Sequence, residues 1–130
     1  MTALGPNLEM PFANLLGLTV TRQDKDQVTA KMLIRPELCT AGGFVHGGAL
    51  MAFADSVGAI ATVLNLPEGA QGTATIESKT NFVRSAKPGE TIVSNTTPVH
   101  IGRRTQVWQT RLETEDGKLI ALVTQTQMIL

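Results

Sequence analysis

One long apolar segment, residues 47–66, constrains the fold of this chain more than any other feature. Its larger apolar side chains recur at the spacing of an α-helix, at Leu50, Phe53, Val57, Ile60, Ala61 and Leu64. Small residues fill most of the other side, so the helix is apolar nearly all round, and such a helix is normally buried nearly all round. We expect it to begin after His46 and to end before Pro67 and Gly69.

The same segment is long enough to cross a membrane, since a spanning helix needs about 20 apolar residues. Asp55 in its middle argues against that interpretation. A carboxylate at the centre of a bilayer costs about 2.5–3.5 kcal/mol on insertion scales, and no other segment could pair with it there. The one cysteine, Cys39, rules out a disulfide within the chain and suits a reducing compartment. We therefore expect a cytoplasmic protein with no membrane partner.

Segments with the alternation and composition of β-strands surround this helix. They are Leu15–Arg22, Gln27–Ile34, Thr73–Val83, Thr91–Ile101, Thr105–Thr114 and Leu119–Met128, with a loop over Leu38–Val45. Turn residues separate the last four strands, at Pro88-Gly89, Gly102 and Asp116-Gly117. This order predicts an α+β fold in which one antiparallel sheet packs on one helix. We expect one domain over residues 1–130, with residues 1–12 as a loose arm, and a homodimer or homotetramer that covers the remaining face.

The chain carries 11 basic and 11 acidic residues, so its net charge gives no reason to expect a nucleic-acid partner. A local group of cations could still bind a small anion. The candidates are Arg84, Lys87, Arg103 and Arg104, which lie at the ends of expected strands. Such residues either grip phosphate groups or are ordinary solvated turn residues.

Two glycines, Gly47 and Gly48, form the first turn of the expected helix. The N–H groups of a first turn have no partner within the helix, and this end carries roughly half a positive charge. Glycine leaves those groups unshielded, so a carbonyl oxygen that becomes an oxyanion could bind there. The alternative is that the two glycines only allow the loop to pack closely.

Asp55 is the acidic residue of the apolar helix, and a carboxylate in such surroundings needs a hydrogen-bonding partner. It is a candidate catalytic acid or base, or else a residue hydrogen-bonded at a dimer seam. His46 is a candidate for acid–base chemistry or for capping the helix. Cys39, His46 and Asp55 have the residue types of a nucleophilic triad, but Asp55 lies more than two helical turns beyond His46. The histidines and acids show no metal-ligand spacing, so no metal is expected.

The residues VHGGA at 45–49 and AD at 54–55 resemble the hallmark of hotdog-fold thioesterases, in particular the phenylacetyl-CoA (PaaI-like) branch. That hallmark is a His-Gly-Gly motif followed by an acid near the middle of the helix. The resemblance runs from about Leu15 to Leu130 and includes the strand order. It implies a hotdog fold, in which a sheet of five or six antiparallel strands wraps one long helix. It also implies a dimer with two active sites at the interface, often paired into a tetramer.

The same resemblance implies hydrolysis of an acyl-CoA thioester. Gly47 N–H would polarise the thioester carbonyl, with Gly48 beside it, and Asp55 of the facing subunit would act as general base or nucleophile. His46 would shape the loop, and Thr75 would lie near the leaving group or the water. Arg84, Arg103 and Arg104 would bind the CoA phosphates. A thioester is already activated, so we expect no cofactor, with CoA present only as part of the substrate and product.

One residue departs from the family pattern. Family members commonly carry Asn or Gln six residues before the histidine, and this chain has Thr40 there. Threonine reaches less far, which favours a second hypothesis, a non-catalytic protein that binds acyl-CoA in the same pocket. Dehydration of a hydroxyacyl thioester would need an acid–base motif that the sequence lacks, and a purely structural role would not explain Asp55.

Overall fold

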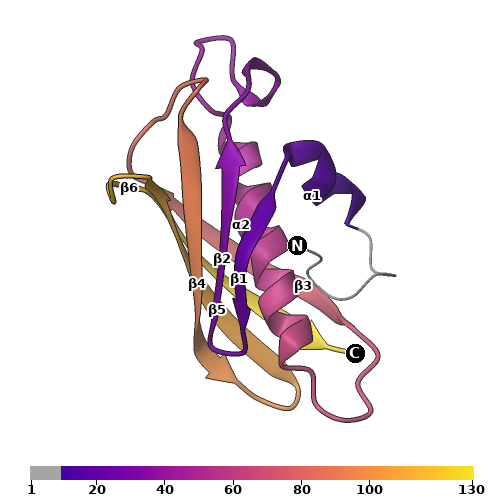
Figure 1. Ribbon diagram of the computed structural model, residues 1–130. Coiled ribbons are helices and arrows are strands. Elements are labelled where there is room, and N and C mark those ends of the chain that lie inside the picture. The colour runs from indigo at the N-terminus through magenta and orange to yellow at the C-terminus, as the bar shows by residue number, and fades with distance from the viewer. Residues whose placement is uncertain (1–9) are drawn as a thin grey trace.

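The computed structural model describes residues 10–130, and Figure 1 shows its arrangement. In chain order the elements are α1 (Pro11–Leu16), β1 (Thr19–Asp24), β2 (Gln27–Leu33), the short 3-10 helix η1 (Pro36–Leu38), α2 (Gly47–Leu64), β3 (Thr73–Phe82), β4 (Thr91–Ile101), β5 (Thr105–Thr114) and β6 (Leu119–Ile129). Of the predicted arm, residues 1–9 lie outside the described part of the chain. Pro11 and Phe12 belong to α1.

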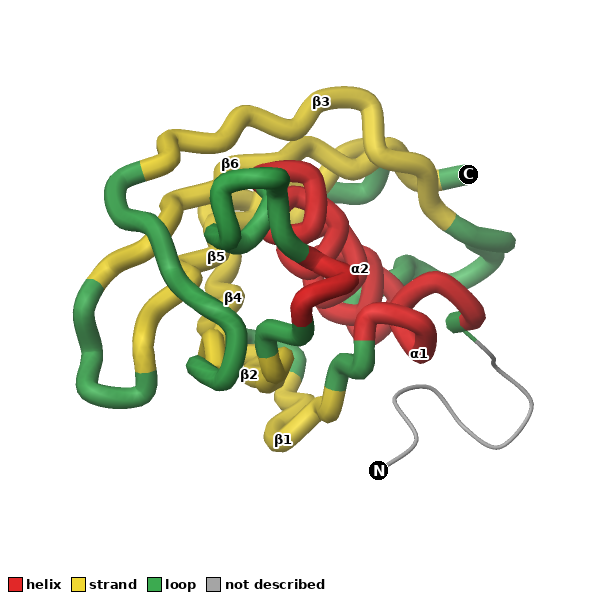
Figure 2. The backbone as a smooth tube through the Cα atoms, turned by 90° about the horizontal axis from the view of Figure 1, so that it is seen from above, coloured by secondary structure: helices red, strands yellow, loops and turns green. Residues whose placement is uncertain are grey.

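The strands form one antiparallel sheet in the order β1-β2-β4-β5-β6-β3. Viewed along α2, the sheet curves around the helix (Figure 2). The predicted α+β hotdog architecture, with six strands, is therefore confirmed. The two edges of the sheet are β1 and β3, so the strand that directly follows α2 is an edge strand.

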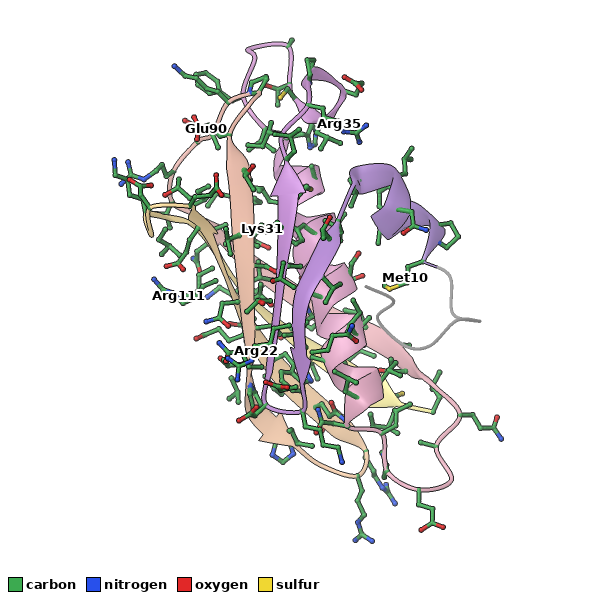
Figure 3. All side chains as sticks on the ribbon, viewed as in Figure 1. Met10, Arg22, Lys31, Arg35, Glu90 and Arg111 are labelled. Atoms are coloured by element: carbon green, nitrogen blue, oxygen red, sulfur yellow. The ribbon has the colours of Figure 1, made fainter. Side chains whose placement is uncertain are left out.

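The core fills the concave side of the sheet. Strand residues alternate, and in β2 the buried positions are Val28, Ala30 and Met32. They pack with Phe53 of α2 and Trp108 of β5 in one continuous cluster. Burying a side chain of this size stabilises the fold by about 1.5–3 kcal/mol relative to leaving it exposed. The opposite face carries charged side chains, such as Arg111, which extends away from α2 (Figure 3).

The predicted first strand over Leu15–Arg22 is wrong at its beginning. Residues 11–16 form α1 instead, because Pro11 suits the first position of a helix and Gly17 ends it with a positive φ of 81°. Ala13 and Leu16, three residues apart, are buried on one face of this turn. The predicted loop over Leu38–Val45 also contains order, since Cys39 and Val45 form an isolated antiparallel bridge.

The expectation that α2 is buried all round is wrong for the single chain. The helix is long and apolar enough to cross a membrane by length and composition alone, but half of it is buried inside the fold. The sheet covers only one side, where Phe53, Val57 and Ile60 lie. On the other side Met51 is exposed and Asp55 is half-buried.

Strand β3 is also covered poorly. Of its ten residues, none is buried, and Ile76 and Phe82 are more than half exposed. Among residues 10–130, its only strand neighbour is β6. An edge strand with apolar side chains and one row of unpaired backbone groups is a template for another strand. β3 adjoins the uncovered side of α2, because Thr75 of this strand donates a hydrogen bond to the half-buried Asp55.

Candidate active site

The start of α2 is set by His46, which is the N-cap residue. Its Nδ1 atom accepts a hydrogen bond from Gly48 N–H at 2.7 Å, and its own N–H donates to Leu38 O at 2.8 Å. A ring nitrogen that accepts carries no proton, so any proton of the neutral ring is on Nε2. His46 thus has the geometry of the capping alternative, and Gly48 N–H is already occupied.

Gly47 N–H is the free donor at this helix start, because no hydrogen bond engages it within residues 10–130. The residue is half-buried, and a Cβ atom built on it would lie 3.1 Å from the ring of Phe82. Glycine therefore allows Phe82 to pack against the helix start without covering the N–H. A hollow of about 370 Å³ opens here, lined by Gly47, Phe82, Val45, Leu50, Val83, Arg84 and Ser85.

Asp55 lies eight residues after Gly47, about 12 Å along the helix axis. Its Oδ1 atom accepts a hydrogen bond from the Thr75 hydroxyl of β3 at 2.7 Å. The predicted site residues Asp55 and Thr75 are therefore brought together, whereas Asp55 and Gly47 of the same chain are not. The Asp55 carboxylate is therefore too far from Gly47 of its own chain to act on a carbonyl group bound there.

Behind Thr75 lies a residue that the sequence reasoning missed. Gln127 of β6 is 1% exposed, and its Nε2 atom donates to Thr75 Oγ1 at 2.6 Å. Gln125, two residues earlier, is fully buried and donates to Ala54 O of α2 at 3.0 Å. The signal was present in the sequence, because two glutamines continue the alternation of Val123 on the inward face of β6.

The buried amide of Gln125 needs space on α2 that a side chain at position 58 would fill. A Cβ atom at Gly58 would come closer than 3.0 Å to the amide end of Gln125. Gly58 therefore lets β6 bring an amide against α2 beside Asp55. A glycine in the middle of a helix costs about 1 kcal/mol relative to alanine, and here that cost makes room for the amide.

The nucleophilic triad is not formed. Cys39 donates its thiol to Arg35 O at 3.5 Å, His46 caps the helix, and Asp55 bonds Thr75. Within residues 10–130 no group of three His, Cys, Asp or Glu side chains could hold a metal ion. Thr40 lies in the turn before the helix, where its N–H donates to Phe44 O and its own carbonyl accepts from Gly43 N–H.

The basic residues that we considered as one group lie at two ends of the molecule. Arg84 N–H donates to Ile120 O, whereas Arg104 O accepts from Ile129 N–H at the far end of β6. Nine residues of a strand span about 30 Å, so Arg84 and the pair Arg103 and Arg104 of one chain cannot grip one phosphate group.

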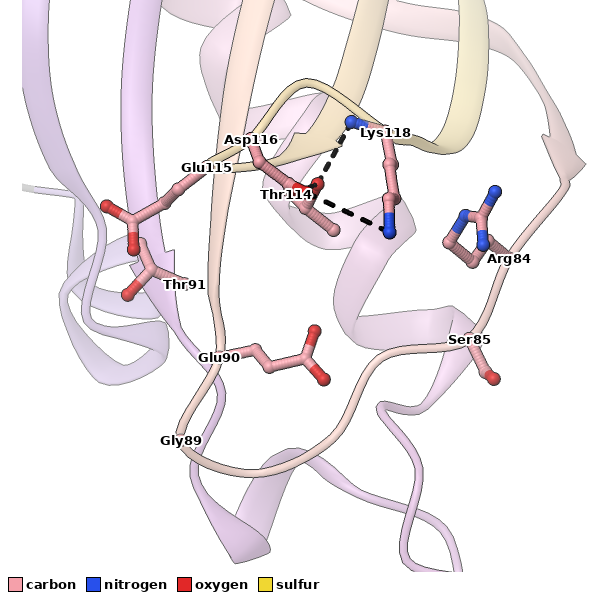
Figure 4. Close-up of a pocket in the computed structure, with 9 residues that line it drawn as sticks. All are labelled: Arg84, Ser85, Gly89, Glu90, Thr91, Thr114, Glu115, Asp116 and Lys118. Carbon is pink, nitrogen blue, oxygen red and sulfur yellow. Dashed lines mark hydrogen bonds and ion pairs between the residues drawn. The ribbon is translucent and has the colours of Figure 1, made fainter.

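Arg84 borders a polar hollow of about 560 Å³ near the β5–β6 turn (Figure 4). Asp116 lies in the same hollow, with Lys118 beside it. The Thr114 hydroxyl donates to the Asp116 carboxylate and, with the charges of Lys118 and Arg84, holds its pKa below the ordinary value. The hollow mixes both signs of charge, because Glu90 and Glu115 also line it.

A third hollow lies on the α1 side of the helix start. Its volume is about 440 Å³ and its lining is mainly apolar, from Phe12, Leu15, Leu16, Leu38, Cys39 and Ala49, with Arg35, Glu37, His46 and Gly48. Gly47 lines the hollow of about 370 Å³, whereas its neighbours His46 and Gly48 line this one. The start of α2 therefore borders two cavities.

Known proteins share this fold and this helix. The sequence profile described as the thioesterase superfamily matches residues 42–121. The 1,4-dihydroxy-2-naphthoyl-CoA hydrolase of Escherichia coli is 35% identical over 105 residues, which cover 81% of this chain and 76% of the relative. A thioesterase structure from Haemophilus influenzae has a TM-score of 0.84 and 28% identity, covering 92% of this chain and 82% of the other.

The chain belongs to the thioesterase superfamily, a family of hydrolases. The structure of the E. coli PaaI protein from the phenylacetic acid degradation operon shares its fold, with a TM-score of 0.85 at 20% identity over 92% of this chain and 85% of that one.

Proposed function

We propose that this protein hydrolyses an acyl-CoA thioester to a free acid and CoA, with Asp55 as general base or nucleophile. The observation that carries the proposal is the pair of groups on α2, an unengaged Gly47 N–H at its start and a carboxylate held by Thr75 at its middle. A thioester carbonyl needs one donor for the developing oxyanion and one base for water. The helix supplies both kinds of group.

The reaction follows from these roles. Asp55 takes a proton from water as the water oxygen bonds to the carbonyl carbon, and Gly47 N–H donates to the carbonyl oxygen. The tetrahedral intermediate then collapses, the C–S bond breaks, and the CoA sulfur takes up the proton that Asp55 received from water, which restores the carboxylate. If Asp55 attacks directly, a mixed anhydride forms and CoA leaves first, and water then cleaves the anhydride.

The two groups come from different subunits in this proposal. Within one chain they are about 12 Å apart along the helix, too far for one carbonyl to meet both. Asp55 on the uncovered side of α2 bonds Thr75 of β3, so the exposed residues of these two elements adjoin in one surface of the chain. Pairing of two such surfaces in a homodimer, alone or within a homotetramer, would bring Asp55 of each chain to the Gly47 end of its partner.

The substrate itself is proposed from the cavities and the charges. The apolar hollow beside His46 and Gly48, about 440 Å³, suits an acyl group of medium length or an aryl group. The name of the E. coli relative, a hydrolase of a naphthoyl-CoA, favours the CoA thioester. No cofactor enters the proposed chemistry, and CoA takes part only as substrate and product.

Arg103 and Arg104 are the proposed contacts of the CoA phosphates, and Arg84 is the weaker candidate because acidic residues share its hollow. Replacing Arg103 and Arg104 together by alanine is expected to raise KM for acyl-CoA about 10-fold or more, the effect of one or two charged hydrogen bonds. The same variant should retain its KM for the matching acyl-pantetheine, which lacks these phosphates. Equal KM increases for both substrates would contradict the assignment.

The central test is Asp55→Asn, which keeps the shape of the side chain and an oxygen that can accept from Thr75. We expect the loss of a general base to lower kcat by about 100-fold or more, with the oligomer and thermal stability unchanged. Release of free CoA from a panel of acyl-CoA substrates measures this, with Asp26→Asn in the β1–β2 turn as the matched control. Equal rates in wild type and Asp55→Asn would refute the role of Asp55.

A second candidate is binding of acyl-CoA without turnover. Thr40 favours it, because the loop before the helix holds a short hydroxyl side chain where Asn or Gln is common in the family. The panel separates the two functions. Tight binding of an acyl-CoA with no release of CoA by the wild type would support the binding protein.

A further inference from the structure

A line of hydrogen bonds leads from the centre of the fold to Asp55. Gln125 and Gln127 lie on the inward face of β6, and Thr75 lies beside Gln127 on β3. Gln127 Nε2 donates to Thr75 Oγ1 at 2.6 Å, and Thr75 Oγ1 donates to Asp55 Oδ1 at 2.7 Å. Both glutamines are buried, the bond from Gln127 to Thr75 is part-buried, and the bond from Thr75 to Asp55 lies at the surface of the single chain.

The direction of every bond in this line is set by a backbone carbonyl. Ala54 O can only accept, so Gln125 must turn its Nε2 toward it, at 3.0 Å. The Oε1 atom of Gln125 then faces Gln127 and accepts from its Nε2. The remaining N–H of that Nε2 group points to Thr75. Because Thr75 Oγ1 accepts there, its single proton is left for Asp55.

The other side of Gln127 supports the same orientation. Its Oε1 atom accepts from Thr73 Oγ1 at 3.0 Å. Turning the amide of Gln127 over would place its oxygen against Gln125 Oε1, where neither atom has a proton to donate. The contact with Gln125 therefore holds the amide in one orientation.

We propose that Gln127 is a positioning residue for the hydrolysis, acting through Thr75 on Asp55; this inference rests on the function proposed above. A Thr75 hydroxyl that must donate fixes Asp55 Oδ1 as an acceptor. It thereby orients the carboxylate so that Oδ2 is the oxygen left for water or for the carbonyl carbon. Without Gln127 the hydroxyl can rotate and accept or donate elsewhere, and Asp55 loses its orientation.

The buried glutamines argue for a role beyond packing. An apolar side chain at position 127 would fill the same space without a polar group to satisfy, and burying an unpaired amide costs about 1–3 kcal/mol. Gly58 supports the same view, because only the absence of a side chain there leaves room for the amide of Gln125. The buried glutamines and this glycine are both explained if their role is to orient the Asp55 carboxylate.

The test compares Thr75→Val, Thr75→Ser, Gln127→Met and the double variant Thr75→Val with Gln127→Met. We expect Thr75→Val and Gln127→Met each to lower kcat about 10-fold to 100-fold, the effect of one hydrogen bond to a charged group. KM should change less than 3-fold, on the order of half a kcal/mol. Thr75→Ser, which keeps the hydroxyl, should restore most of kcat.

The double variant is the decisive measurement. If Gln127 acts through Thr75, removing it from Thr75→Val causes no further loss of kcat. The proposal would be overturned if the two single losses of kcat multiplied in the double variant. It would also be overturned if Gln127→Met kept the wild-type kcat or changed only KM. Gln127→Glu is the second variant if Gln127→Met is too unstable, because a carboxylate accepts the Thr75 proton and should lower kcat in the same way.

A readout without turnover separates this inference from the proposed function. The side-chain amide NMR signals of Gln127, identified by their loss in Gln127→Met, should shift in Thr75→Val and in Asp55→Ala. They should remain in place in the control Asp26→Asn. Unshifted signals would refute the hydrogen-bonded line even in an active enzyme, whereas shifted signals in a protein that releases no CoA would refute the hydrolytic function alone.

Discussion

Replacing Gly58 by alanine tests how closely the sheet and helix are fitted beside the candidate site. On an ordinary helix this change stabilises, because alanine is favoured over glycine by about 1 kcal/mol. In this protein the added Cβ atom would come closer than 3.0 Å to Nε2, Cδ and Oε1 of Gln125. The amide end must therefore move away, and it is fully buried.

The size of the effect follows from what Gln125 loses. Overpacking a core position costs about 1–3 kcal/mol, and a buried amide that loses its acceptor at Ala54 O costs about 1–3 kcal/mol more. Subtracting the helix preference of about 1 kcal/mol leaves a net destabilisation of about 1–5 kcal/mol. Because Gln125 orients Gln127, kcat should fall as well.

Denaturant unfolding at one fixed protein concentration measures this free energy, since the stability of an oligomer depends on concentration. Gly72→Ala is the matched control. A Cβ atom there meets nothing within 4 Å and the backbone φ is not positive, so we expect no loss of stability. A Gly58→Ala protein as stable as wild type, or more stable, would refute the close fit of Gln125 to α2.

Two further predictions concern the turn and the edge of the sheet. Thr114→Val removes the hydroxyl that holds the pKa of Asp116 low, so an NMR titration should find that pKa raised toward its ordinary value; an unchanged pKa would assign the shift to the neighbouring cations. Ile76→Lys places a charge on the free edge strand β3, where Ile76 is 54% exposed. We expect it to weaken the proposed dimer at least about 10-fold in sedimentation equilibrium, and an unaltered oligomer would exclude this edge from the interface.

Local patterns in the sequence were sufficient for most of the fold. The bounds of β4 and β5 coincide with the predicted segments, because alternation and turn glycines act over a few neighbouring residues. The acid of the helix and the His-Gly-Gly start were recognisable for the same reason. Leu15 and Leu16 were misassigned, since one helical turn between Pro11 and Gly17 is too short for a periodic signal.

The sequence by itself determined that Asp55 interrupts an apolar helix and that glycines leave its start open. Only the tertiary structure decided what holds Asp55, because Thr75 and Gln127 are 52 residues apart in the chain and meet through the pairing of β3 with β6. It also separated Arg84 from Arg104 by the length of a strand. Periodicity carries information about nearest neighbours, whereas hydrogen-bonded side chains from different strands depend on sheet order and register, which are set by packing across the whole domain.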